Sequence, residues 1–243
     1  MTKPSNKRYD VSAGLVGLSA QTSREDSARR TLLENWTKDP WNWLTGIDTD
    51  GTPVVWTRDE REGRFRPYPN KEYLRELVHE LYFGEEKVQI IEKSRQMLLT
   101  TSAVLLALHM IVTHEAQRIL FSKVTEDESQ EILKDKCRGP WERMPEWLRT
   151  EWPINKKPAG VVTATKTGST ILALAENSAD REVRGGGASW VIIDEAAYQG
   201  CTADIVSAAI PMARKITCIS TPMAGSLGGE YLKSLIDDRK WSG

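Results

Sequence analysis

The sequence predicts an α/β fold with a mostly parallel central sheet flanked by helices. Three short apolar runs of strand length, at residues 87–91, 190–193 and 216–219, are separated by stretches with the apolar spacing of helices. This alternation is typical of parallel sheets with helices on both faces. Ligands of such sheets bind at the carboxyl ends of the strands, so we expect the functional residues directly after these three runs.

The chain has 243 residues, enough for one or two domains, and its composition divides it into three parts. Residues 1–22 are polar and predict a flexible N-terminal arm. Residues 23–64 form an extension that contains four of the nine tryptophans, with a helix opened by the capping residue Ser23 and a hairpin around residues 52–57. Residues 65–243 form the core of the domain.

The elements of the core follow from hydrophobic spacing. Apolar residues on one face predict a helix over residues 70–83, which Gly84 ends. The other predicted helices cover residues 102–112, 126–136 and 229–240, and the other predicted strands cover residues 118–121, 160–165 and 169–174, the last two joined as a hairpin.

Composition excludes several classes of protein. Lys and Arg number 33 against 34 Asp and Glu, and a net charge of −1 excludes a protein that coats nucleic acid through bulk positive charge. The three cysteines form no CxxC pair, which indicates neither a disulfide framework nor a zinc site. The N-terminus lacks the apolar core of a signal peptide, and the longest apolar stretch, residues 98–112, is shorter than the roughly 18 residues of a membrane span. We therefore expect a soluble protein that is not secreted.

Two acids, Asp194 and Glu195, follow the apolar run 190–193. Acids at the end of a buried strand are unfavourable unless a cation or a reacting group faces them. In nucleotide hydrolases of the P-loop type, this Asp holds Mg²⁺ and the next Glu orients and deprotonates the attacking water. The alternative is that the two acids only stabilise the N-terminus of a helix.

A candidate phosphate-binding loop follows the run 87–91, in the order strand, loop and helix. The usual pattern is GxxxxGK[ST]. Placing Thr100 at its last position puts Leu98 and Leu99 where the second glycine and the lysine stand. A helix N-terminus still offers N–H groups to a phosphate, and Lys93 can reach phosphates from the start of the loop. The candidate nucleotide-binding residues are Lys93, Ser94, Arg95, Gln96, Met97, Leu98, Leu99, Thr100 and Thr101. The alternative is that Lys93 and Arg95 are solvated loop charges.

Two further segments are candidates for phosphate recognition. Ser220 and Thr221 follow the run 216–219, where their hydroxyls can sense a γ-phosphate or simply form a turn before proline. A glycine-rich loop, residues 181–187, carries Arg181 and Arg184 ahead of the acid pair. Arginine on such a loop suits phosphate recognition, although an ordinary surface loop has the same composition.

The order and spacing of these residues resemble the N-terminal ATPase domain of the large terminase subunit of tailed double-stranded DNA bacteriophages, over roughly residues 65–240. Residues 95–100 resemble the RQxGKT loop of this family, and Lys93-Ser94 is similar to deviant loops that carry their lysine at the start. The other similar motifs are residues 144–148 (LPxWL in the family), 184–197 (an Arg-Gly loop followed by hhhDEAA) and 220–222 (the coupling motif). The sequence departs from the family at Leu98 and Leu99, and at Asn70, where the family has an adenine-side glutamine after a Pro-Tyr element.

The resemblance implies a P-loop NTPase of the additional-strand, RecA-like type that hydrolyses ATP with Mg²⁺ to translocate double-stranded DNA into a procapsid. Lys93 and the loop then hold the phosphates, Asn70 contacts the adenine side, and Thr100 and Asp194 hold Mg²⁺. By the same resemblance, Glu195 would be the catalytic base and Arg184 would be the arginine finger, in cis or in trans. Ser220 and Thr221 would be the coupling residues.

The resemblance also implies partners and a location. These are double-stranded DNA, the portal protein, the small terminase subunit and a homo-oligomeric ring, a pentamer, in the host cytoplasm and without a membrane. We expect the isolated domain to be a monomer that binds DNA weakly. The family's C-terminal nuclease domain is not among residues 1–243, so we expect an ATPase domain cut from a longer protein. Two alternatives stay open: a helicase-like duplex DNA ATPase, and a degenerate nucleotide-binding assembly module without hydrolysis.

Overall fold

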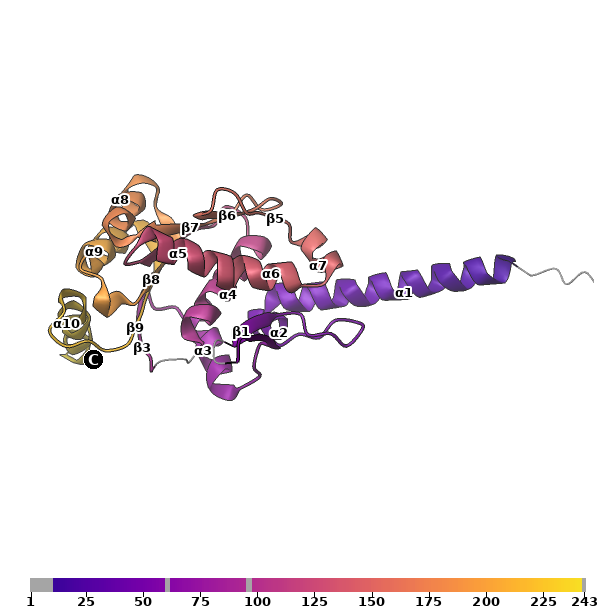
Figure 1. The fold of residues 1–243 in the computed structure, drawn as a ribbon, viewed down its shortest axis with the longest axis horizontal. Helices are drawn as coiled ribbons and strands as arrows, with labels where there is room; N and C mark the ends of the chain where they lie inside the picture. Colours follow the sequence, from indigo (N-terminus) through magenta and orange to yellow (C-terminus); the bar gives the residue numbers. More distant parts are fainter. Residues whose placement is uncertain (1–10, 60–61, 95–97, 242–243) are drawn as a thin grey trace, which may run out of the picture.

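The computed structural model describes residues 11–59, 62–94 and 98–241, and its central feature is a seven-stranded sheet (Figure 1). The order is β3-β9-β8-β4-β7-β6-β5, with bounds Val88–Glu92, Ala213–Ser220, Ala188–Asp194, Arg118–Lys123, Thr170–Ala175, Val161–Ala164 and Ile154–Asn155. The first five strands are parallel to one another. Strand β6 pairs antiparallel with β7, and β5 pairs antiparallel with β6. The predicted mostly parallel sheet is therefore confirmed.

Helices cover both faces of this sheet because alternate strand residues point to opposite sides. Phe121 and Ile192 lie in the hydrophobic cluster of one face, and Leu120 and Ile193 in the cluster of the other. The first face is covered by α3 (Glu72–Phe83), α4 (Leu99–Thr113), α5 (Glu126–Ile132), the π-helical turn η1 (Leu133–Arg138), α6 (Gly139–Arg143) and α7 (Glu146–Glu151). The second face is covered by α8 (Glu176–Gly186), α9 (Thr202–Met212) and α10 (Leu227–Trp241).

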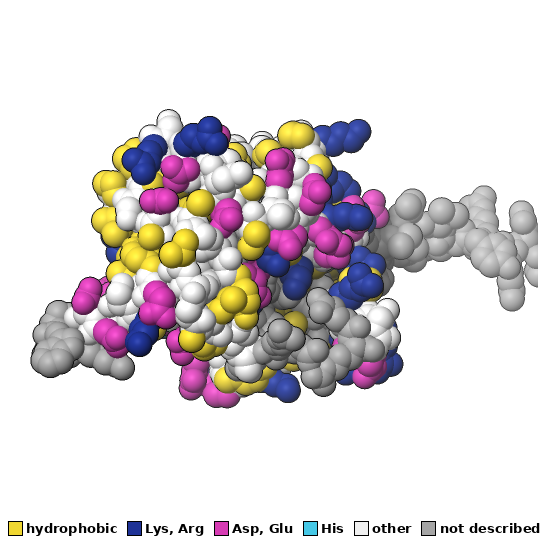
Figure 2. Space-filling model, turned by 60° about the vertical axis from the view of Figure 1, so that its left-hand side comes forward, with side chains coloured by type: hydrophobic (Ala, Val, Ile, Leu, Met, Phe, Trp, Pro, Cys, Tyr) yellow, Lys and Arg dark blue, Asp and Glu magenta, His cyan; other side chains and the backbone are white. Residues whose placement is uncertain are grey.

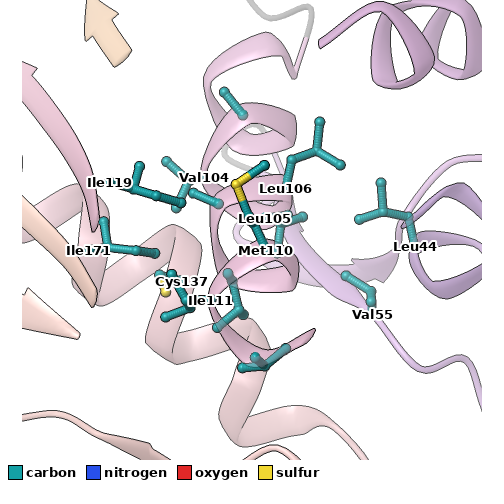
Figure 3. Close-up of a cluster of buried hydrophobic side chains, with 14 of the residues drawn as sticks. Leu44, Val55, Val104, Leu105, Leu106, Met110, Ile111, Ile119, Cys137 and Ile171 are labelled. Atoms are coloured by element: carbon teal, nitrogen blue, oxygen red, sulfur yellow. The ribbon is translucent and has the colours of Figure 1, made fainter. Parts of the chain in front are cut away.

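Helix α4 lies at the centre of the first face, and all its residues from Leu99 to Val112 are buried. A helix that is apolar on every side needs partners on every side. Figure 3 shows α4 between Ile119 and Ile171 of the sheet and, on its far side, Leu44 and Val55 of the N-terminal extension. This packing fixes the helix, and with it the position of its N-terminus at the edge of the sheet.

The N-terminal extension consists of α1 (Val11–Lys38), α2 (Pro40–Leu44) and the hairpin β1–β2 (Trp56–Asp59 and Arg64–Pro67). Helix α1 extends away from the body of the molecule, and its C-terminal part packs into the core through Leu32, Leu33 and Trp36 (Figure 1). The helix begins at Val11, ahead of the predicted start at Ser23, and so includes much of the segment that was expected to be a flexible arm. Residues 1–10 of that arm lie outside the described residues.

Most predicted elements are present, with three differences besides the start of α1. Helix 126–136 continues past Ile132 as a π-helical turn, and its hydrophobic face stays in the core through Leu133 and Cys137. The hairpin predicted around residues 52–57 is present but lies later in the chain: its antiparallel pair begins at Trp56 and ends at Pro67, and Val54 and Val55 before it are buried in the core. The third difference, at residues 181–187, concerns the site. In the part of the chain that the structure describes, no helix combines the length and apolarity that a membrane crossing requires.

Candidate functional site

A cluster of charged side chains lies at the carboxyl ends of β3, β9 and β8. Lys93 follows β3 directly, and its backbone N–H donates to the carbonyl of Ser220, the last residue of β9, at 2.9 Å. Asp194 ends β8, and Thr100 is in the first turn of α4. Parallel strands bring their carboxyl ends to one edge, so residues separated by about a hundred positions in the sequence meet there.

Lys93, Thr100 and Asp194 form a closed triangle of hydrogen bonds. Lys93 Nζ donates to Thr100 Oγ1 at 2.9 Å and to Asp194 Oδ1 at 3.1 Å, and Thr100 Oγ1 donates to the same carboxylate oxygen at 2.8 Å. The side chain of Asp194 is 2% exposed and that of Lys93 is 11% exposed. Burying either charge alone would be strongly unfavourable, so the two groups stabilise each other in this position.

Glu195 stands beside this triangle at a sharp turn of the chain. Its Oε1 lies 3.3 Å from Lys93 Nζ, and its side chain is 31% exposed. Its φ of +58° is in the left-handed region, which is unusual for a residue other than glycine, and it turns the chain from β8 into the 3-10 helix η2 (Ala196–Tyr198). Strained backbone of this kind concentrates at functional sites, and here it presents a carboxylate at the rim of the cluster.

Ser220 and Thr221 are hydrogen-bonded to the turn that follows Glu195. The hydroxyl of Ser220 accepts from the N–H of Ala197 at 3.0 Å and donates to the Thr221 carbonyl at 2.9 Å. The hydroxyl of Thr221 donates to the Tyr198 hydroxyl at 3.2 Å. The two residues therefore connect the start of the loop at Lys93 with the turn that carries the second acid.

The loop keeps a glycine-like turn without its glycine. Leu98, at the second glycine position of the usual pattern, has a φ of +57° and precedes the first residue of α4. Its carbonyl accepts hydrogen bonds from both the N–H and the hydroxyl of Ser102. The hydroxyl of Tyr68 is hydrogen-bonded to the same Ser102 hydroxyl at 2.7 Å. Burial raises the pKa of Tyr68 to about 12, further above neutral pH than the value of an ordinary tyrosine. The Pro67-Tyr68 element is thus hydrogen-bonded to the first turn of α4.

The remaining loop candidates have different environments. Ser94 is exposed, whereas Leu99 and Thr101 are buried in the first turn of α4. Arg95, Gln96 and Met97 lie outside the described residues. Asn70 is exposed between β2 and α3, two residues after Tyr68.

The predicted glycine-rich loop over residues 181–187 is wrong. These residues continue α8, whose buried Ala179 and Val183 hold it against the sheet, and the helix ends at Gly187 with a φ of +66°. Arg184 is an exposed helical residue whose guanidinium lies 3.9 Å from Asp180. Arg184 lies before the first residue of β8, and Asp194 is the last residue of that seven-residue strand. The length of the strand, about 20 Å, therefore separates Arg184 from Asp194. Arg184 is therefore not brought to the acid pair of its own chain.

Sequence reasoning missed two residues of the site. Gln199 is fully buried, donates to the carbonyls of Asp194 and Ser122 at 2.7 and 3.2 Å, and accepts from the Ser122 hydroxyl at 3.1 Å, which fixes the end of β8 to the end of β4. Lys123 ends β4, and its Nζ lies 3.8 Å from Asp194 Oδ2. The rule that functional residues follow strands would have found Lys123, but its strand was predicted to end at Phe121.

The oxygen ligands of the cluster suit magnesium. The hydroxyl of Thr100 and the carboxylate of Asp194 are hard oxygen donors already in contact, and Mg²⁺ in nucleotide sites uses one or two protein ligands together with phosphates and waters. Within the described residues, His, Cys, Asp and Glu form no group of three that would make a complete metal cage. The residues present fit a metal that arrives with a nucleotide.

The sheet and the cluster together define a fold of the P-loop NTPase type. A lysine-bearing loop leads from β3 into a buried helix, and an acid pair follows β8, with β9 between the two strands. No family model matches the chain, and no curated protein matches it.

Solved structures of phage enzymes are similar to the chain. The large terminase of bacteriophage HK97 has a TM-score of 0.56 and 13% identity, over 72% of this chain and 38% of that chain. The large terminase of a thermophilic bacteriophage has a TM-score of 0.49 and 13% identity, over 70% of this chain and 44% of that chain. The large terminase ATPase domain of Thermus phage P74-26 has a TM-score of 0.45 and 17% identity, over 63% and 70% respectively.

The similarity to the HK97 enzyme shows that the chain shares the fold of part of that large terminase, as the resemblance of its motifs predicted. The chain spans about two fifths of the length of that enzyme.

Proposed function

We propose that this chain is the ATP-hydrolysing motor domain of a phage DNA-packaging terminase, which translocates double-stranded DNA into a procapsid. The observation that carries the proposal is the cluster of Lys93, Thr100, Asp194 and Glu195 at the carboxyl edge of the sheet. The fold shared with the HK97 large terminase supports the same assignment.

In this proposal the phosphates of ATP bind at the N-terminus of α4. Free N–H groups and the positive end of the helix dipole attract phosphate there, and Lys93 adds a full positive charge. Thr100 and Asp194 hold Mg²⁺, which when bound neutralises part of the phosphate charge. Lys93, which is hydrogen-bonded to both of these groups, would contact the phosphate oxygens next to the metal.

Glu195 is the proposed general base. Its carboxylate is at the rim of the cluster and one third exposed, so a water molecule can reach it. It orients that water toward the γ-phosphate and takes its proton, while the water oxygen bonds to the γ-phosphorus and the bond from that phosphorus to the bridging oxygen of the leaving ADP breaks. Ser220 and Thr221 then transmit the loss of the phosphate, because they are bonded to the turn that follows Glu195.

The proposed partners follow from the same assignment. They are double-stranded DNA, the portal protein and the small terminase subunit, with a homo-oligomeric ring, a pentamer, as the working state in the host cytoplasm. On the face that Figure 2 shows, basic and acidic side chains are interspersed, which supports weak DNA binding by the isolated domain. Arg184 is exposed and too far from its own acid pair, so its proposed role as an arginine finger is in trans, at a neighbouring subunit's site.

The substitution Glu195→Gln tests the proposal. It removes the base and keeps the shape of the side chain, so we expect steady-state ATP hydrolysis to fall by about 10²- to 10⁴-fold while calorimetric binding of a non-hydrolysable ATP analogue is retained. The matched control is Glu151→Gln, at an exposed glutamate paired with Lys166 on another part of the surface. Hydrolysis by Glu195→Gln at the parental rate would refute the assignment of the base, and failure of the parent to bind nucleotide with Mg²⁺ would refute the proposed function.

A further inference from the structure

Lys123 is a second lysine at the acid pair, on the opposite side from the phosphate-binding loop. In the register of β4 and β8, Ser122 lies beside Ile193, which places Lys123 next to Asp194 at the edge of the sheet. Its Nζ is 3.8 Å from Asp194 Oδ2, and its side chain is 20% exposed. This separation is longer than a hydrogen bond, so the ammonium retains capacity for another oxygen ligand.

The two oxygens of Asp194 face different lysines. Oδ1 accepts from Lys93 and Thr100, which come from β3 and α4, and Oδ2 faces Lys123, which comes from β4. Since the strand order is β3-β9-β8-β4, the acids lie between the two lysines. Among the described residues, the cations that pair with Asp194 or Glu195 are these two lysines.

The direction of the nucleotide across this edge follows from the same order. The helix N-terminus that attracts phosphates follows β3, and the acid proposed to activate water follows β8, so the terminal phosphate lies toward β8. Strand β4 is the next strand beyond, about 5 Å further on. Lys123 is therefore on the side where hydrolysis takes place, and its flexible stem allows the ammonium to turn toward that phosphate.

We propose that Lys123 is a second phosphate-binding cation, which contacts the γ-phosphate of ATP. The inference rests on the proposed function of the site. With Mg²⁺ held at Asp194, the added positive charge would weaken the attraction between the carboxylate and Lys123, and the ammonium would be available to the phosphate oxygens. Such a contact also places positive charge where the transferring phosphoryl group needs it, at a site that Arg184 of the same chain does not reach.

The test compares two nucleotides on three variants by isothermal titration calorimetry with Mg²⁺. A contact to the γ-phosphate exists with ATP and not with ADP. We therefore expect Lys123→Met to weaken binding of a non-hydrolysable ATP analogue by about tenfold or more and binding of ADP by less than about twofold. We expect Lys123→Arg, which keeps the charge, to restore most of the analogue affinity. Lys166→Met, at an exposed lysine of the β6–β7 turn, is the matched control and should change neither affinity.

Each other outcome is decisive. An equal loss of affinity for both nucleotides would overturn the inference, because it would mean that Lys123 acts only by holding Asp194. An unchanged analogue affinity in Lys123→Met, beside a parent that binds both nucleotides, would overturn the inference and leave the proposed function standing. A parent that binds neither nucleotide would overturn both. Should Lys123→Met fail to give a cooperative thermal transition, Lys123→Gln is measured against the same two nucleotides.

Discussion

At the scale of single residues, Leu98 shows how the proposed phosphate-binding turn forms without the usual glycine. A left-handed backbone costs a leucine about 1–2 kcal/mol, and here two hydrogen bonds from Ser102 to the Leu98 carbonyl hold the turn. The side chain of Leu98 also packs against the core, which glycine could not do. A search for the glycine pattern alone would therefore pass over a turn that the chain does form.

The neighbouring residue, Leu99, provides a test of which side chain supplies the positive charge of the loop. Leu99 stands where the usual lysine would be, and it is buried at 4% exposure. We expect Leu99→Ala to lower the free energy of unfolding by about 2–4 kcal/mol and to leave nucleotide affinity within about twofold. We expect Lys93→Met to weaken binding of the ATP analogue by about tenfold or more, because a charged contact to phosphate is lost.

Urea unfolding and calorimetry on both variants separate these two effects. The opposite pattern, with nucleotide binding lost in Leu99→Ala and kept in Lys93→Met, would refute the role of Lys93.

Individual site residues differ in how far the sequence reveals them. Asp194 and Glu195 are recognisable because charged residues directly after a buried apolar run have few structural explanations. Gln199 gives no such signal, since its importance comes from bonds to the ends of two strands that are far apart in the sequence. The pairing of Lys123 with Asp194 likewise depends on β4 lying beside β8, and no local sequence pattern predicts that these two strands are neighbours.

At the scale of elements, α8 shows where local reasoning fails. Three consecutive glycines predict a loop, but Val183 is fully buried, and this packing carries the helix through Gly185 and Gly186 before Gly187 ends it. Tertiary contacts thus override the low helix propensity of glycine. The apolar strands and the amphipathic α3 were predictable because their spacing alone specifies which face is buried.

Two glycine substitutions test this helix end. A Cβ at Gly185 meets open space, so we expect Gly185→Ala to raise the free energy of unfolding by about 0.5 kcal/mol. At Gly187 the left-handed backbone and a Met212 carbonyl 3.1 Å from the added Cβ both oppose alanine, so we expect a loss of about 1–2 kcal/mol. Urea denaturation of the two variants measures both effects. A loss in Gly185→Ala as large as that in Gly187→Ala would mean that the segment is not helical in solution.

At the scale of the whole molecule, the strand order could not be predicted from the sequence, because the pairing of strands depends on contacts between distant segments. Local patterns gave the strands and their polar ends, and these suffice to predict a parallel sheet with a site at one edge. They do not tell which strand lies beside which. The order decides that Lys123 faces the acid pair.

The position of Arg184 gives a prediction about the proposed ring of subunits. Since this arginine is far from its own site, we expect Arg184→Ala to leave the slow hydrolysis of the monomer unchanged and to remove the increase in rate on assembly. In rings that mix Arg184→Ala with Glu195→Gln subunits, a site with an intact Glu195 can receive the arginine of its neighbour. Measured ATPase activity should therefore recover in part.

The matched control is Arg214→Ala, at another exposed arginine, near the start of β9. Rings of this variant should keep the increase in rate on assembly. Rings shown to be mixed, yet without recovery between Arg184→Ala and Glu195→Gln, would contradict a finger in trans.

The place of β9 in the sheet also determines when the site can form during synthesis. Strand β9 is the last strand of the described chain to leave the ribosome, yet it lies between β3 and β8, and Gln89 is bonded to Thr217, 128 residues later. Until residues 213–220 emerge, β3 has no neighbouring strand, and Lys93 cannot be held opposite Asp194. Contacts of such long range form late because a long loop must close first. A nascent chain therefore cannot form the proposed nucleotide site until residues 213–220 have been made.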